Sequence, residues 1–212
     1  MTDLRGRLAL YVVTDDRDDR DSLLRACQAA LRGGAGAIQL RRKRDSGRSL
    51  IELGRTLRDL TAAHQALYFV NDRVDVALAT DADGVHIGQD DMPLPDARRL
   101  LGQKIIGVSA TTLDEARRAT TEGADYLGVG AVFATPSKAD ADISGLAGLR
   151  AIADVVHGCP LVAIGGIGEA NADTVLEAGA DGLAVISAVM SATDPEEAAR
   201  RLRERVEALR RR

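Results

Sequence analysis

Eight short apolar runs recur along the 212-residue chain, with helix-like stretches between them. The runs cover residues 8–14, 37–41, 67–72, 84–87, 104–110, 126–133, 160–166 and 182–189. Nearly continuous runs rich in Val and Ile are typical of strands buried on both faces, as in a parallel sheet. Repeated strand–helix units in a chain of this length predict an α/β fold, a (β/α)₈ TIM barrel over 1–212 as a single domain, rather than a doubly wound open sheet.

The stretches between the runs have helical periodicity and defined ends. "LDEARRATTEGA" and "NADTVLEAGA" both end in Gly-Ala, which predicts that a helix stops and a turn follows. In the last segment, "RRLRERVEALRRR", Leu202, Val206 and Leu209 recur at helical spacing. We therefore interpret this segment as a terminal helix with a charged outer face rather than as an RNA-binding tail.

Composition excludes several classes of function. The net charge of −4 and the aromatic content of 2% argue against a nucleic-acid partner and against a stacking platform for single strands. The first residues contain no long apolar run, so neither a signal peptide nor a membrane span is expected. Cys27 and Cys159 lack the spacing of metal ligands, and two cysteines indicate no disulfide framework. A reducing, cytoplasmic location is expected; the oligomeric state stays open, a homo-oligomer included.

In such a barrel the active site gathers where the strands end, so the polar residues after each run are the candidates. The second run continues into "QLRRK", where alternation places Gln39, Arg41 and Lys43 on one face. Two cations and an amide aimed into a barrel mouth are costly without an anion. The alternative is a solvated basic loop, since Arg44 follows, and the residues alone do not decide between the two.

Acidic residues follow the third and fourth runs. Asn71 and Asp72 come after the third, and Gln89, Asp90 and Asp91 after the fourth. Acids at neighbouring strand ends suggest a hard divalent cation, because Mg²⁺ is typically held by one or two carboxylates plus substrate phosphates. A helix cap is the alternative for each acid, and for Asp72 taken alone it is at least as good an explanation.

The fourth and fifth runs carry two further polar groups. His86 lies inside a predicted strand and is interpreted as a packed or hydrogen-bonded residue rather than a catalytic one. Ser109 follows the fifth run and is able to donate to a phosphate oxygen. Thr112 is predicted to cap the next helix, with Glu115 completing a capping box.

The last two strand ends indicate a phosphate site. Gly165 and Gly166 follow the seventh run, and Ser187 follows the core of the eighth. In barrels a phosphate is often held by the loops after strands 7 and 8, on backbone N–H groups. A tight turn is the alternative for the glycines, but both loops carry the feature together.

The sixth run ends in "FATPSK", which combines two hydroxyls, a rigid turn and a cation. These residues are Thr135, Pro136, Ser137 and Lys138. The segment lacks the spacing of a Walker loop, yet it has the groups that bind an anion. The strand ends therefore predict two anionic ligands: a monophosphate on backbone amides, and a pyrophosphate on cations with Mg²⁺.

Taken in order, the strand-end motifs resemble those of the thiamine-phosphate synthase (thiamine-phosphate pyrophosphorylase) family over nearly the whole chain. They are "YVVTD", "QLRRK", "VNDRVDVAL", "DGVHIGQDD", "GVSATT", "YLGVGAVFATPSK", "AIGGI" and "GADGLAVISAV". Each motif is weak singly, but the ordered set is specific. The resemblance implies a transferase that joins a pyrimidine methyl diphosphate to a thiazole ethyl phosphate and releases pyrophosphate by a Mg²⁺-assisted, dissociative substitution.

The resemblance also implies roles for individual residues. For the pyrimidine diphosphate it implies Gln39, Arg41, Lys43, Asn71, Ser109 and Lys138. Among these it implies Arg41, Lys43, Ser109 and Lys138 as the catalytic set. For Mg²⁺ it implies Asp72 and Asp91. For the thiazole phosphate it implies Thr135, Pro136, Ser137, Gly166, Ile186 and Ser187.

The chain departs from the family pattern at four positions: Arg42 replaces an acid, Ala131 and Ala134 replace prolines, and Thr111 replaces a histidine. Alternation points Arg42 away from the diphosphate. A related group of barrels isomerises a thiazole phosphate and is expected to use a histidine near position 111, a part that a threonine hydroxyl cannot take near neutral pH. A non-catalytic phosphate sensor is a third interpretation, but it has no need for the full set of Asp72, Asp91 and Lys138.

Overall fold

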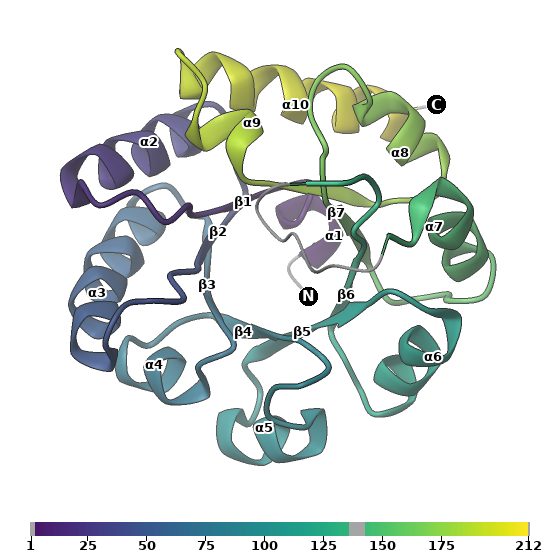
Figure 1. Ribbon diagram of the computed structural model, residues 1–212, viewed down its shortest axis with the longest axis horizontal. Coiled ribbons are helices and arrows are strands. Elements are labelled where there is room, and N and C mark those ends of the chain that lie inside the picture. Colours follow the sequence, from purple (N-terminus) through teal and green to yellow (C-terminus); the bar gives the residue numbers. More distant parts are fainter. Residues whose placement is uncertain (1–2, 136–142, 212) are drawn as a thin grey trace.

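The computed structural model describes residues 3–135 and 143–211, and its strands pair in sequence order into one closed parallel barrel (Figure 1). The strands are β1 (Leu10–Val13), β2 (Ala37–Leu40), β3 (Leu67–Asn71), β4 (Gly84–Ile87), β5 (Ile105–Ala110), β6 (Tyr126–Val129), β7 (Leu161–Ile164) and β8 (Gly182–Val185). Parallel pairing of β1 with β8, in the register Leu10↔Leu183, closes the ring. The predicted barrel is confirmed.

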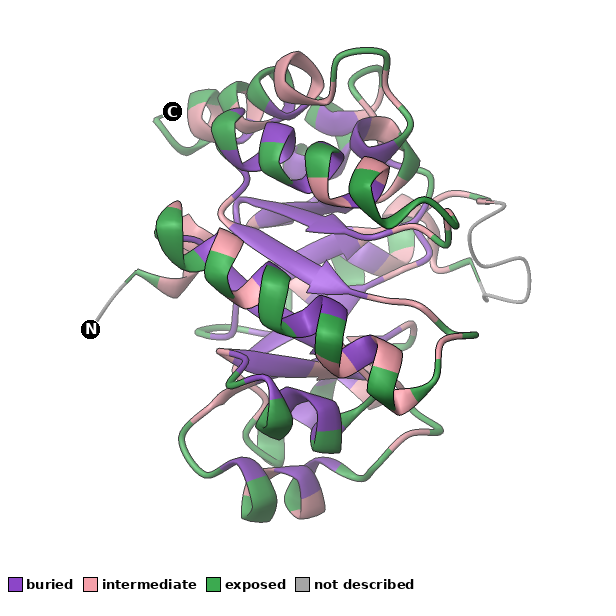
Figure 2. Cartoon of the chain, turned by 90° about the vertical axis from the view of Figure 1, so that its left-hand side faces the viewer, coloured by how far each residue is buried: buried purple, intermediate pink, exposed green. Residues whose placement is uncertain are grey.

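Helices surround the barrel and turn their apolar faces inward, so the strands are buried and the outer helix faces exposed (Figure 2). They are α1 (Leu4–Arg7), α2 (Arg20–Arg32), α3 (Gly47–Ala63), α4 (Val74–Ala79), α5 (Leu94–Leu101), α6 (Leu113–Thr121), α7 (Gly145–Ala153), α8 (Ala172–Glu177), α9 (Ser187–Met190) and α10 (Pro195–Arg210). No helix of the described ranges, 3–135 and 143–211, is both long and apolar enough to cross a membrane.

The local helix signals are also confirmed. Thr112 and Glu115 form the predicted capping box at the start of α6. Gly123 and Gly179 follow α6 and α8 with φ of +91° and +105°, a left-handed conformation that ends a helix and favours glycine.

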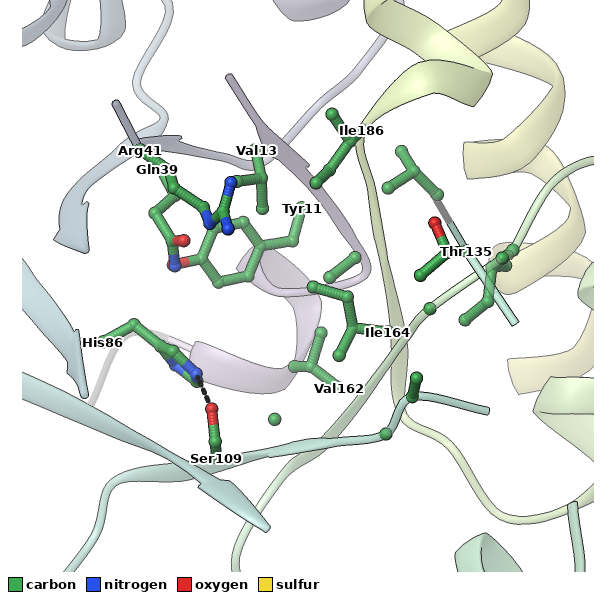
Figure 3. A pocket seen from close by; sticks show the side chains of 18 of the residues that line it. Tyr11, Val13, Gln39, Arg41, His86, Ser109, Thr135, Val162, Ile164 and Ile186 are labelled. Atoms are coloured by element: carbon green, nitrogen blue, oxygen red, sulfur yellow. Dashed lines mark hydrogen bonds between the residues drawn. The ribbon is translucent and has the colours of Figure 1, made fainter. Parts of the chain in front are cut away.

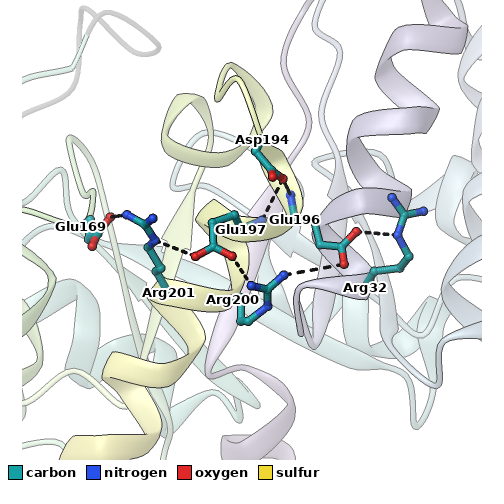
Figure 4. Close-up of polar contacts among 7 residues, drawn as sticks. All are labelled: Arg32, Glu169, Asp194, Glu196, Glu197, Arg200 and Arg201. Atoms are coloured by element: carbon teal, nitrogen blue, oxygen red, sulfur yellow. Dashed lines mark hydrogen bonds and ion pairs between the residues drawn. The ribbon is translucent and has the colours of Figure 1, made fainter.

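The last helix, α10, buries the predicted apolar stripe and carries ion pairs on its outer side. Leu202 is buried there, as is Val206. Glu197 pairs with Arg200 and Arg201, while Glu196 pairs with Arg32 of α2 (Figure 4). The helix therefore has the charged outer face that the sequence predicts.

Two apolar runs extend well past the strands that they contain: residues 187–189 of the eighth run belong to α9, and the sixth run includes a loop. The apolar run 126–133 continues past β6, which ends at Val129. Val132 and Phe133 instead donate backbone hydrogen bonds to the carbonyl oxygens of Ile164 and Gly165, at 2.9 and 3.0 Å. The end of the run is thus a partly buried loop lying against the end of β7, and apolar composition alone does not distinguish such a loop from a strand.

The apolar side chains form two separate clusters. One lies between strands and helices; the other fills the barrel interior with Leu8, Tyr11, Val13, Ala37, Leu67, Phe69, Tyr126, Val162 and Ala184. Leu4 of α1 packs against the interior cluster, at the end of the barrel where the strands begin. The interior is therefore a packed core, and the opposite end is left for the site.

Candidate active site

A cavity of about 690 Å³ lies where the strands end, a size typical of small-molecule sites. The residues predicted for the site and placed in the described ranges all line it: Gln39, Arg41, Lys43, Asn71, Asp72, Asp91, Ser109, Thr135, Gly166, Ile186 and Ser187. The topology thus brings together side chains from β2 to β8. Their individual roles toward substrates stay predictions.

Arg41 and Lys43, with Asp72 and Asp91, form what we call the charged wall. Thr14 fixes the backbone of Arg41 twice, because its hydroxyl donates to the Arg41 carbonyl oxygen at 3.1 Å and accepts from the Arg41 N–H at 2.9 Å. These bonds join the loop after β1 to the loop after β2. The backbone that carries the two cations is therefore held at a defined place on the barrel rim.

Arg42 is turned away from this wall. Its Nε donates to Asp45 Oδ2 at 2.9 Å, its guanidinium also donates to the carbonyl oxygen of Arg17, and it does not line the cavity. Arg42, which stands where the family usually has an acid, is thus neutralised by an ion pair with Asp45 in the same loop. The predicted orientation of Arg42 is confirmed.

The two acids of the charged wall face each other. Asp72 has a φ of +62°, and its backbone N–H donates to the carbonyl oxygen of His86 at 2.8 Å. The helix α4 has Arg73 at its N-cap without a side-chain cap, so the alternative of Asp72 as a helix cap is not what the structure has. Asp91 Oδ2 accepts from the Gly88 N–H at 2.7 Å.

Burial, followed by hydrogen bonding and repulsion from Asp91, raises the pKa of Asp72 to about 6, although Lys43 and Arg41 lower it in part. Two neighbouring carboxyl groups oppose each other's ionisation. A divalent cation bound between them would reduce this repulsion, and carboxylate oxygens are suitable ligands for it. Within residues 3–135 and 143–211, no cluster of three acidic, His or Cys residues suited to a metal occurs. The pair therefore fits Mg²⁺ only with further oxygen ligands, such as water or substrate phosphates.

Gly165, Gly166 and Ser187 form what we call the glycine wall. This wall offers backbone N–H groups instead of charged side chains. Gly165 and Gly166 have φ of +104° and +62°. A Cβ atom on Gly166 would lie 2.8 Å from Phe133 Cβ, so a side chain there collides with the loop after β6. In the part of the chain that the structure describes, the N–H groups of Gly166 and Ser187 have no hydrogen-bond partner, as an anion site requires.

Asn171 supports the glycine wall through two hydrogen bonds within the loop after β7. Its Oδ1 accepts from the Gly168 N–H at 2.9 Å, and its Nδ2 donates to the Gly166 carbonyl oxygen at 2.9 Å. The same loop is tied to α10, since Glu169 pairs with Arg201 at 3.5 Å (Figure 4). Asn171 was not predicted as a site residue, although an Asn just before a helix after a Gly-rich turn is a recognisable turn signal.

The segment "FATPSK" is only partly described. Thr135 lines the cavity, and the carbonyl oxygen of the preceding Ala134 would lie 2.9 Å from a Cβ on Gly166. The start of the segment therefore adjoins the glycine wall. Pro136, Ser137 and Lys138 lie outside the described residues. Thr111 donates from its hydroxyl to the carbonyl oxygen of Gly130 at 3.1 Å, so it tethers the loop after β6.

A chain of polar groups runs through the barrel interior, and Figure 3 shows four of its members, Gln39, Tyr11, His86 and Ser109, with the hydrogen bond between the last two. Gln39 Nε2 donates to the Tyr11 hydroxyl at 2.9 Å, and the Tyr11 and Tyr126 hydroxyl groups lie 3.0 Å apart. His86 Nδ1 lies 3.0 Å from the Tyr126 hydroxyl, and its Nε2 lies 2.9 Å from Ser109 Oγ. The hydrogen-bonded role predicted for His86 is confirmed.

Tyr11 and Tyr126, the two tyrosines of this polar chain, both line the cavity but were not predicted as site residues. Alternation from Val13 places Tyr11 on the interior face of β1, and this was the available signal. A tyrosine within an apolar run is nevertheless indistinguishable from an ordinary core residue until its partner is known.

Comparisons with known proteins agree with one another. Residues 10–189 match a family model described as thiamine monophosphate synthase. The chain is 58% identical over 198 residues to the thiamine-phosphate synthase of Moorella thermoacetica, covering 92% of this chain and 94% of that one. It is 52% identical over 204 residues to that of Pyrococcus furiosus, covering 96% and 97%.

A solved structure agrees as well. The thiamine phosphate pyrophosphorylase of Pyrococcus furiosus superposes with a TM-score of 0.89 at 49% identity, covering 98% of this chain and 99% of that chain. A 3-hexulose-6-phosphate synthase from Salmonella typhimurium, at 14% identity and a TM-score of 0.72, shares the fold alone.

Proposed function

This chain belongs to the thiamine monophosphate synthase family, and on that premise we propose that its cavity joins an aminopyrimidine methyl diphosphate to a thiazole ethyl phosphate, giving thiamine phosphate and pyrophosphate. One observation carries the proposal: the charged wall, after β2 to β4, and the glycine wall, after β7 and β8, line the same cavity. A reaction between two phosphorylated substrates needs two anion sites within reach of each other.

The charged wall is the proposed diphosphate site. Arg41 and Lys43 supply positive charge, and Asp72 and Asp91 would hold Mg²⁺. When bound, the cation neutralises charge on the diphosphate as it leaves. Lys138, beyond the described residues, is proposed to add a point charge to the same leaving group. Asn71 and Ser109 also line the cavity and are proposed to orient the pyrimidine diphosphate by hydrogen bonds.

The glycine wall is the proposed thiazole phosphate site. The N–H groups of Gly166 and Ser187, uncommitted among the described residues, bind phosphate oxygens with little help from side-chain charge. Thr135 lies at the edge of this site, and Ile186 gives apolar packing for the ring. Pro136 and Ser137 are proposed to extend this site. Phosphate held there places the thiazole ring toward the cavity centre.

The chemistry between the walls is proposed to be dissociative. An amino-substituted pyrimidine stabilises cationic character on its methylene carbon, so breaking the C–O bond releases pyrophosphate before the thiazole nitrogen attacks. Because the thiazole nitrogen carries no proton to remove, no general base is required. The walls then act by stabilising the leaving group and positioning the acceptor.

Phosphorylated substrates and two buried, unpaired cysteines fit a cytoplasmic location.

The test is to incubate the protein with both substrates and Mg²⁺ and to follow thiamine phosphate by chromatography. We expect formation of thiamine phosphate and equimolar pyrophosphate, lost on chelation and restored by added Mg²⁺. Conversion of a thiazole phosphate isomer without the pyrimidine would identify an isomerase instead, and binding without turnover would identify a sensor. Either result overturns the proposal.

A further inference from the structure

The polar chain through the barrel interior runs along the cavity, and all five of its members belong to the cavity lining. Gln39 and Ser109, its end residues, line the cavity and come from β2 and β5. Its middle members Tyr11, Tyr126 and His86 are not needed by the proposed chemistry. A polar chain in a packed core is costly unless its members satisfy one another, so its arrangement is informative.

Each middle member has one proton with which to donate a hydrogen bond to its neighbour. Burial raises the pKa of Tyr11 and of Tyr126 far above the ordinary value, so both hydroxyl groups stay protonated. Each phenol therefore has a single proton to donate, and a neutral imidazole donates from one nitrogen and accepts at the other. In such a chain, the direction of one hydrogen bond sets the direction of all the others.

Gln39 sets the direction. Its Nε2 donates to Tyr11, so the Tyr11 proton points to Tyr126, and the Tyr126 proton points to His86 Nδ1. The Nε2–H of His86 then donates to Ser109 Oγ, which leaves the Ser109 proton for the cavity. Gln39 Oε1 makes no hydrogen bond to any residue of the described ranges, so it is left as an acceptor.

Two glycines keep the middle of the chain in place. A Cβ atom on Gly107 would lie 2.0 Å from Tyr126 Cζ, and one on Gly128 would lie 2.6 Å from His86 Cε1. Side chains at either position would expel the ring that lies there. The tyrosine and histidine rings therefore occupy space that β5 and β6 leave open for them.

We propose that Tyr11, Tyr126 and His86 are positioning residues that couple an acceptor at Gln39 to a donor at Ser109, and thereby select a 4-aminopyrimidine over its 4-oxo counterpart. An aminopyrimidine edge offers an N–H donor and a ring-nitrogen acceptor, which complements this pair. The oxo compound offers a carbonyl acceptor and a ring N–H donor, the reverse pattern. The inference rests on the proposed function and adds the recognition of the pyrimidine.

The reversed pattern fits only if the whole chain reverses, which includes turning the buried Gln39 amide, 4% exposed. A site whose buried polar groups are left unpaired by the wrong ligand discriminates strongly. Removing one hydroxyl group from the middle of the chain would let the Gln39 amide and the Ser109 hydroxyl change their hydrogen-bond directions independently. Discrimination, rather than affinity in general, is therefore the property that these residues control.

The experiment measures binding of two non-reacting probes, the 4-amino and 4-oxo forms of 2-methyl-5-(phosphooxymethyl)pyrimidine. Calorimetry at about pH 8, where an imidazole is ordinarily neutral, gives the ratio of their Kd values. We expect the wild-type protein to favour the amino form by about a hundredfold or more. We expect Tyr126→Phe to lower this ratio at least about tenfold, with the Kd for the thiazole phosphate unchanged.

Tyr68→Phe is the matched control, because Tyr68 is buried in the outer cluster and its hydroxyl lies outside the polar chain. It should leave the ratio unchanged. Tyr11→Phe is the second variant and keeps the test open if Tyr126→Phe does not fold. A ratio near one in the wild type, or an unchanged ratio in the folded variants, overturns the inference. Absence of thiamine phosphate synthesis in the wild type would instead overturn the proposed function.

Discussion

The charged wall and the glycine wall line the same cavity but are proposed to hold an anion by opposite means. At the charged wall, the binding groups are side chains such as Lys43 and Asp91, whose charge reaches beyond contact distance. At the glycine wall, they are backbone N–H groups, and the contribution of Gly166 is the absence of a side chain. One wall should therefore respond to changes of charge and pH, and the other to changes of shape.

The largest expected effect comes from removing an acid of the charged wall. We predict that Asp91→Ala lowers kcat at least about a hundredfold, because loss of a metal ligand removes several kcal/mol of charge stabilisation in the transition state. Steady-state kinetics across a Mg²⁺ titration checks this. KM for the thiazole phosphate should change little. Unchanged turnover with unchanged metal dependence would remove Asp91 from the metal site.

Shape should dominate at the other wall. We predict that Gly166→Val raises KM for the thiazole phosphate about thirtyfold, since its Cβ would lie 2.8 Å from Phe133 Cβ. KM for the pyrimidine diphosphate should rise far less. Gly102→Val is the control, because Gly102 has a similar φ of +59° but a Cβ atom there would have nothing within 4 Å, so it isolates the backbone cost. Equal effects on both substrates would show that the two walls are wrongly assigned.

Cation binding at the charged wall should also depend on pH. The pKa of Asp72, raised to about 6, means that protons compete with a cation as the pH falls through 6. We predict that the Kd for Mn²⁺, a spectroscopic substitute for Mg²⁺, rises about tenfold from pH 7 to pH 5. Electron paramagnetic resonance measures this Kd in the absence of substrates, so that titration of substrate phosphates does not contribute. Asp72→Asn should bind weakly at both pH values, and a pH-independent Kd in the wild type would contradict the assignment.

The smallest expected effect tests the support of the glycine wall. Asn171→Ala removes two hydrogen bonds, to Gly166 and Gly168, and should raise KM for the thiazole phosphate about fivefold, with kcat nearly unchanged. Arg201→Met is the control, because its ion pair to Glu169 is exposed and contributes little. An Asn171→Ala variant that weakens both substrates alike would indicate general loosening of the barrel rim.

The two walls also differed in how far the sequence predicted them. Alternation along an extended chain places Arg41 and Lys43 together, because that rule depends only on local backbone geometry. The choice between cap and metal ligand for Asp72 depended instead on its φ of +62° and on the approach of Asp91 from the next strand. Neither is a local property of the sequence.

Long-range partners were the least predictable feature. Tyr11 and Tyr126 are 115 residues apart, and each taken alone looks like an apolar core residue. Only closure of the barrel shows that their hydroxyl groups meet. The end of β6 at Val129 was missed for a related reason, since Val132 is buried by a loop contact rather than by strand pairing.

Closure also bears on how the chain folds as it is made. Strand β1 has β8 as one of its two neighbours, and Leu183 emerges from the ribosome roughly 170 residues after Leu10. At ordinary translation rates of about 5–20 residues per second, one edge of β1 waits on the order of 10–30 s for its partner. Such long-range pairing makes the ring slow to close and leaves an open strand edge for chaperones or neighbouring chains to meet first.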